Sequence, residues 1–106
     1  MNNARHDIAT QIGRHIRGTQ EGLSAFFFNL PMVALATLPS LCVSFASFMS
    51  KGDRHFTIGA LSAAIIKTGA KLDAATSDVT KAMWTRRLNL LDQAQTELVR
   101  PDCLVA

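Results

Sequence analysis

Residues 22–50, GLSAFFFNLPMVALATLPSLCVSFASFMS, decide the fold because they form an uncharged stretch between Glu21 and Lys51. Five of the six phenylalanines of the chain lie in this stretch. A helix of roughly 20 mostly apolar residues crosses a bilayer core about 30 Å thick, so the stretch is long enough to span a membrane. The same side chains would also suffice for the core of a small helical bundle.

Pro31 and Pro39 separate these two hypotheses. In water, a proline inside a helix costs about 3 kcal/mol or more, whereas in a membrane neighbouring groups can satisfy the freed carbonyls. The stretch is therefore either a proline-kinked transmembrane helix or two to three short helices of a soluble bundle. The large side chains of this membrane or core segment are Phe26, Phe27, Phe28, Leu35, Leu38, Phe45 and Phe48.

Residues 3–30 are predicted to form a single helix. Apolar residues recur there at steps of three and four, as at Ile8, Ile12 and Ile16, which is the spacing of one helical face. The first half is amphipathic and the second half is apolar nearly all round. Pro31 is the predicted stop, because the residue before a proline is driven out of the α region.

The proline-interrupted middle, residues 31–50, is expected to divide at Pro39. Ser40 is a suitable cap for a following helix, which we predict to end at Gly52. Residues 51–54 then form a loop, and Asp53 caps the next helix.

A long amphipathic helix, or two nearly collinear helices, is predicted at residues 54–100. Its apolar stripe consists of Ile58, Leu61, Ile65, Leu72, Val79, Met83, Leu90, Ala94 and Leu98, which share one face at 3.6 residues per turn. The weakest part is residues 69–78, where Ser77 can cap a second helix. Pro101 is the predicted end. The predicted fold is all-α and, at 106 residues, a single domain.

This stripe is longer than the rest of so small a chain readily covers, so we predict that the protein associates with a protein partner or with itself. A helix face of this kind can pack in an oligomer or lie in a groove of a partner. The predicted partner-binding residues are Ile58, Leu61, Ile65, Leu72, Val79 and Trp84. Trp84 is expected either to pack against the first helix near Ile8 and Ile12 or to be an exposed anchor for the partner.

No catalytic constellation is recognisable. The sequence contains no GxSxG, Walker A, GxGxxG or HExxH motif, so we predict no catalytic residues and no small-molecule substrate. Cys42 and Cys103 lack zinc-ligand spacing, which predicts no metal site. No cofactor is predicted either. Cys42 is interpreted as a buried free thiol. The net charge is +3, and the basic residues are mixed with acids, which argues against a nucleic-acid partner.

Two functional hypotheses follow. The first is a small non-enzymatic membrane-associated protein, a subunit or accessory of a larger assembly, in an inner or plasma membrane facing a reducing compartment. The alternative is a soluble, cytoplasmic helical-bundle binding module that acts as an adaptor or inhibitor through protein–protein contact. A basic nucleic-acid binder is a less favoured alternative. In addition, the last residues, Cys103-Leu104-Val105-Ala106, fit the C-a-a-X form of a prenylation signal, although no polybasic segment precedes them.

Overall fold

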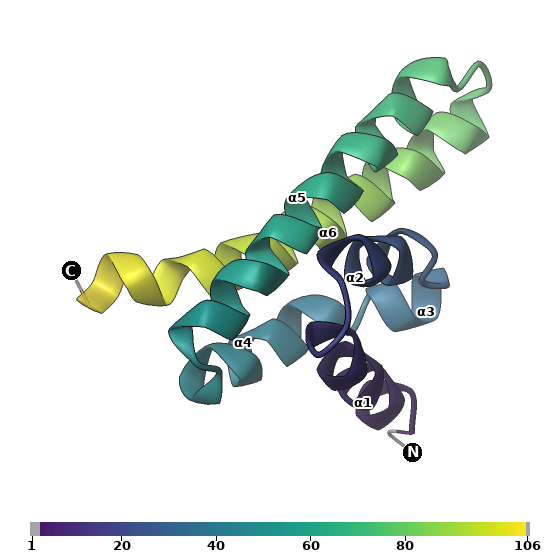
Figure 1. Ribbon diagram of the computed structural model, residues 1–106. Coiled ribbons are helices and arrows are strands. Elements are labelled where there is room, and N and C mark those ends of the chain that lie inside the picture. The colour runs from purple at the N-terminus through teal and green to yellow at the C-terminus, as the bar shows by residue number, and fades with distance from the viewer. Residues whose placement is uncertain (1–2, 106) are drawn as a thin grey trace.

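The computed structural model describes the backbone of residues 3–105 and the side chains of residues 5–100. Its helices are α1 (Asn3–Ile16), α2 (Gln20–Phe28), α3 (Met32–Leu35), α4 (Leu38–Phe48), α5 (Lys51–Ala74) and α6 (Asp78–Val105). No strand occurs in the described backbone, and the predicted all-α class is confirmed. Figure 1 shows a long hairpin of α5 and α6, with the four shorter helices gathered around its lower half.

The predicted single helix at residues 3–30 is wrong, because the chain bends between α1 and α2. Thr19 has an extended backbone (φ −114°, ψ 153°), and its side chain accepts a hydrogen bond from the backbone N–H of Gly22. This is the geometry of an N-cap, so a new helix begins at Gln20. Gly18 precedes the cap and weakens helix continuation. Apolar residues keep helical spacing on both sides of the bend, which is why the sequence pattern does not reveal it.

The two prolines lie at helix starts. α2 ends at Phe28, before Pro31 as predicted, and Pro31 is the N-cap residue of α3. Pro39 is in the first turn of α4, where its missing N–H removes no intrahelical hydrogen bond. The prediction that Ser40 caps this helix is wrong, since α4 already begins at Leu38. The uncharged stretch is thus divided among α2, α3 and α4.

The predicted loop at residues 51–54 is also wrong. α4 ends at Phe48 rather than Gly52, and α5 begins at Lys51. The cap is Ser50, whose hydroxyl accepts a hydrogen bond from the backbone N–H of Asp53 at 3.1 Å. Asp53 therefore lies inside the first turn, where an acidic side chain is favoured by the helix dipole.

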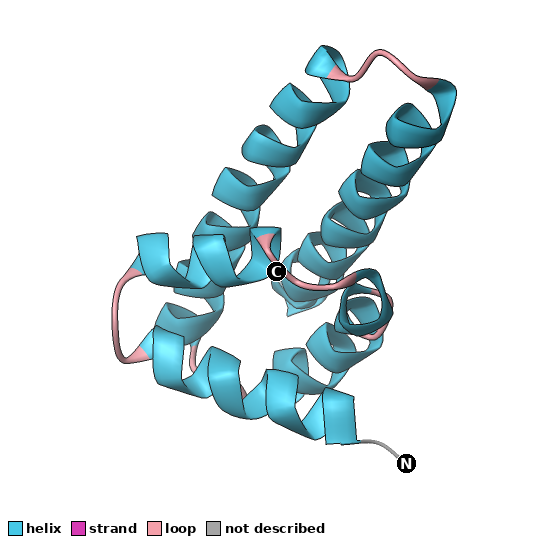
Figure 2. Cartoon of the chain, turned by 90° about the vertical axis from the view of Figure 1, so that its right-hand side faces the viewer, coloured by secondary structure: helices cyan, strands magenta, loops and turns pink. Residues whose placement is uncertain are grey.

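α5 and α6 are antiparallel neighbours and not collinear helices. Figures 1 and 2 show them side by side, joined by the short connection at residues 75–77. Ser77 caps α6 as predicted, and its hydroxyl accepts a hydrogen bond from the backbone N–H of Thr80 at 3.1 Å. α6 continues past Pro101 to Val105, so the predicted stop at Pro101 is wrong.

All six helices, with Leu30 from the connection before α3, supply the hydrophobic core. Its buried residues are Ile8, Ile12, Leu23, Phe27, Leu30, Ala34, Leu35, Leu38, Leu41, Cys42, Phe45, Ala60, Leu61, Ala64, Leu91, Ala94 and Leu98. The uncharged stretch therefore contributes a large share of the chain's own core. Of the predicted membrane or core residues, Phe27, Leu35, Leu38 and Phe45 are buried, Phe26 and Phe28 pack against the core, and Phe48 is 70% exposed. Within the described residues, no helix combines the length and apolarity needed to cross a membrane.

Candidate functional site

The end of the α5–α6 hairpin stands clear of the other helices (Figure 2). We refer to residues 66–87 as the hairpin end. Thr68 on α5 and Arg87 on α6 are buried, and no residue from 69 to 86 is buried. This part of the hairpin nevertheless carries apolar side chains: Ile66 is 73% exposed, Val79 82% and Met83 40%, and Leu72 is half-buried. An uncovered surface of this kind is a candidate for contact with another molecule.

Four residues from three helices meet at the base of the hairpin end and form what we call the aromatic–cation cluster: Phe28, Lys67, Trp84 and Arg87. The rings of Phe28 and Trp84 are stacked, with centroids 5.9 Å apart and planes inclined by 15°. The Lys67 ammonium lies 5.1 Å from the centroid of the Phe28 ring. The Arg87 guanidinium lies 5.8 Å from the centroid of the Trp84 ring. Each ring is thus contacted by the other ring and by one cation, at distances typical of cation–π interactions.

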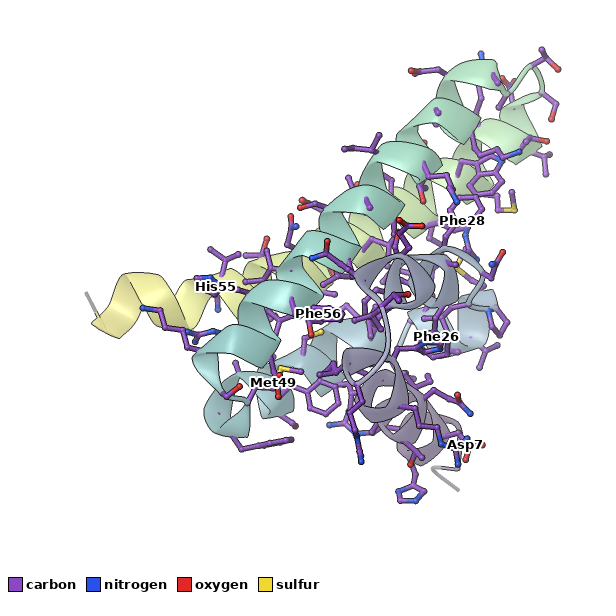
Figure 3. The ribbon with its side chains drawn as sticks, in the orientation of Figure 1. Asp7, Phe26, Phe28, Met49, His55 and Phe56 are labelled. Carbon is purple, nitrogen blue, oxygen red and sulfur yellow. The ribbon has the colours of Figure 1, made fainter. Side chains whose placement is uncertain are left out.

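The local sequence explains this arrangement. Trp84 and Arg87 are three residues apart on α6 and therefore share one face of it. Phe28 is the last residue of α2, so its backbone carbonyl has no partner within the helix. The Arg87 guanidinium donates a hydrogen bond of 2.8 Å to this carbonyl, which also places a cation at the negative end of the α2 dipole. Figure 3 shows Phe28 where α2 meets the hairpin.

No acidic side chain in the described part of the chain neutralises the charge of the cluster. Arg87 is 8% exposed, and its burial lowers the pKa of its guanidinium from the ordinary value of 12.5; arginine nevertheless keeps its proton in proteins. Among the side chains that the structure describes, no carboxylate pairs with Arg87 or Lys67. Glu21 borders the same shallow hollow as Lys67 without forming an ion pair with it. The cluster is therefore cationic.

The predicted partner-binding residues fall into two groups, one in or against the core and one at the hairpin end. Leu61 is fully buried, and Ile58 and Ile65 pack against the core, so these three stabilise the chain's own fold. Leu72, Val79 and Trp84 belong to the hairpin end. Trp84 is half-buried with Phe28 as its ring partner, instead of the predicted neighbourhood of Ile8 and Ile12.

Sequence reasoning did not identify Phe28, Lys67 and Arg87 as members of this site. The spacing of Trp84 and Arg87 could have suggested that these two residues are neighbours. No sequence signal joins them to Phe28, which is distant in the chain.

Chemistry elsewhere in the described residues is limited. They contain no group of three or more His, Cys, Asp or Glu side chains that could hold a metal ion. Cys42 is buried and free, as predicted. The side chains of the C-a-a-X form at Cys103-Leu104-Val105-Ala106 lie outside the described residues.

No protein-family model, curated protein or solved structure matches this chain.

Proposed function

We propose that the protein acts by binding another protein, without catalysis, and that the hairpin end is its contact surface. The observation that carries this proposal is the absence of any buried residue from 69 to 86 on a segment that exposes Val79 and Met83. A partner that covers these side chains would gain the free energy of apolar burial, roughly 25 cal/mol per Å².

The residue types support the same proposal. Tryptophan and arginine are enriched among the residues that dominate binding energies at protein interfaces, and methionine is enriched at interfaces. Trp84, Arg87 and Met83 all belong to the hairpin end. Trp84 and Arg87 are held in place by contacts with Phe28, so little side-chain freedom remains to be lost on binding, which favours affinity.

A pair of exposed substitutions tests this proposal. Val79→Asp combined with Met83→Asp should weaken binding about tenfold or more, because an interface would then bury unpaired charges. The fold should be retained, since both side chains are exposed. The measurement is affinity purification from the native cells with quantitative identification of the recovered proteins, together with the molar mass by light scattering, which detects binding to a second copy.

Val43→Asp is the matched control. Val43 is also an exposed valine, at 52%, but it lies on α4. We expect the wild type and Val43→Asp to recover the same protein, or to show the same self-association, and the double variant to lose it. Recovery that is equal in all three proteins would contradict the proposal, as would a single-chain mass with no recovered protein.

A further inference from the structure

The charge of the chain is concentrated at the hairpin end. Residues 66–87 contain five of the eleven basic residues (Lys67, Lys71, Lys81, Arg86 and Arg87) and two of the eight acidic ones (Asp73 and Asp78). The rest of the chain has six basic and six acidic residues and is balanced. The net charge of +3 is therefore the charge of the hairpin end, which an acidic partner would complement.

The aromatic–cation cluster adds a specific feature to this general charge. Arg87 uses one hydrogen bond, to the carbonyl of Phe28, although a guanidinium has five N–H donors. No N–H nitrogen of Arg87 is among the described side-chain nitrogens that are fully buried without a partner, so Nε and Nη1, which form no hydrogen bond to the described residues, each keep some contact with solvent. The ammonium of Lys67, an exposed residue, lies at the same cluster. Together they offer a carboxylate two cationic groups beside an apolar ring pair.

We infer that the hairpin end binds an acidic protein segment, with carboxylates directed at Arg87 and Lys67 and apolar side chains against Met83 and Val79. This inference rests on the proposed function and specifies the chemistry of the partner. A carboxylate that pairs with a guanidinium forms short, charge-assisted hydrogen bonds, and charge complementarity also raises the rate of encounter.

A protein segment fits this surface better than a nucleic acid does. Binding of single-stranded nucleic acid relies on aromatic rings that are free to stack on bases. The rings of Phe28 and Trp84 already stack on each other and each contacts a cation. The exposed side chains of Val79 and Met83, which belong to the same hairpin end, are aliphatic and suit apolar side chains of a protein.

The experiment uses poly-L-glutamate as the probe and the fluorescence of Trp84 as the signal, because Trp84 is the only tryptophan of the chain. The full chain is titrated with poly-L-glutamate, with an oligothymidylate of similar charge, and with inorganic phosphate. We expect poly-L-glutamate to change the Trp84 emission saturably, with an affinity that falls as salt is raised, and to bind more tightly than the other two. No saturable change with poly-L-glutamate, tighter binding of the oligothymidylate, or an equal response to phosphate alone would overturn the inference.

Replacing single cationic side chains by glutamine shows where poly-L-glutamate binds. Lys67→Gln should weaken poly-L-glutamate binding about two- to fivefold, as for an exposed ion pair, and Arg87→Gln about tenfold or more, as for a largely buried one. Arg14→Gln, at an exposed cation on α1, is the control and should bind as the wild type does. Because Lys67 is exposed, Lys67→Gln should keep the fold, and its affinity for poly-L-glutamate tests the inference even if Arg87→Gln fails to fold. Equal affinities of Lys67→Gln and Arg14→Gln would overturn the inference.

The two proposals can fail separately. If the partner recovered by affinity purification is lost with Val79→Asp/Met83→Asp but binds Lys67→Gln, Arg87→Gln and the wild type equally, the acidic-segment inference is overturned and the proposed function stands. If the partner is recovered equally by the wild type and by Val79→Asp/Met83→Asp, the proposed function is itself contradicted.

Discussion

At the scale of single residues, Trp84 links the stability of the fold to the proposed contact surface. Its ring is half-buried and stacks on Phe28, so Trp84→Ala should lose part of the 3–5 kcal/mol typical of a fully buried tryptophan, together with the aromatic pair. We expect a loss of about 2 kcal/mol in the free energy of unfolding, measured by urea denaturation.

Trp84→Phe is the matched control for this prediction. It keeps an aromatic ring against Phe28 and should cost less than about 1 kcal/mol. Equal stability of the wild type and Trp84→Ala would show that the stacked pair does not hold α2 to the hairpin.

Cys42 provides a prediction about pH. Burial, with a smaller contribution from the negative charge of Glu97, raises the pKa of its thiol from 9.0 to about 12. The folded chain therefore keeps the thiol proton between pH 9 and 12, whereas the unfolded chain loses it, so ionisation favours unfolding as the pH rises. Between pH 9 and 12, ionisation of the Cys42 thiol should lower the free energy of unfolding by at most about 1.4 kcal/mol per pH unit.

The measurement for Cys42 is urea denaturation from pH 8 to 10.5 in a Cys103→Ala background. Cys42→Ala in the same background should show the shallower fall in stability with pH, because the buried thiol is gone. Identical slopes in the two proteins would contradict burial of this thiol. The difference between the two slopes isolates Cys42, because every other ionisable group is the same in the two proteins.

At the scale of the elements, the sequence predicts the helices better than their ends. The N-cap at Ser77 is recognisable from the sequence, because this serine lies between two segments with strong helical periodicity. The bend at Thr19 is not recognisable, since the apolar spacing of Ile12, Ile16 and Leu23 runs through it without interruption. The antiparallel hairpin is missed for a related reason: stripe residues of α5 such as Leu61 and of α6 such as Leu98 are buried in the same core, and the stripe keeps one helical phase across the connection between them.

The candidate site was predictable in part. Val79 and Trp84 are apolar or aromatic residues beside a polar turn, and both belong to the hairpin end. Leu61 looks the same in the sequence, yet it is fully buried, because the helices of the first half of the chain cover the lower part of α5. Tertiary packing decides whether such a residue is buried or exposed, and the helical periodicity of the sequence does not reveal this packing.

The amide hydrogens of the hairpin end should be less protected from exchange than those in the rest of α5 and α6. Its residues 69–86 include none that is buried, whereas Leu91, Ala94 and Leu98 on the same helix are fully buried. Local opening is easiest where few apolar contacts are lost. We expect amide hydrogens at residues 70–74 and 82–86 to exchange faster than those at residues 90–98, measured by native-state hydrogen exchange. Equal protection along α6 would contradict this account.

At the scale of the whole molecule, the uncharged stretch forms three helices whose large side chains mostly face the chain's own core. Membrane association, the first of the two functional hypotheses, stays a prediction. A carbonate wash of lysed cells tests it, because an inserted chain would remain with the membranes and a chain that is not inserted would be released.

The central claim is that the hairpin end contacts another protein, and site-specific photocrosslinking in the native cells tests it most directly. A photoreactive amino acid is placed at Val79 in one protein and at Val43, on α4, in the other; both positions are exposed. We predict a discrete crosslinked product at Val79, to a partner or to a second copy, and none at Val43. No product at Val79, or equal products at the two positions, would contradict the claim.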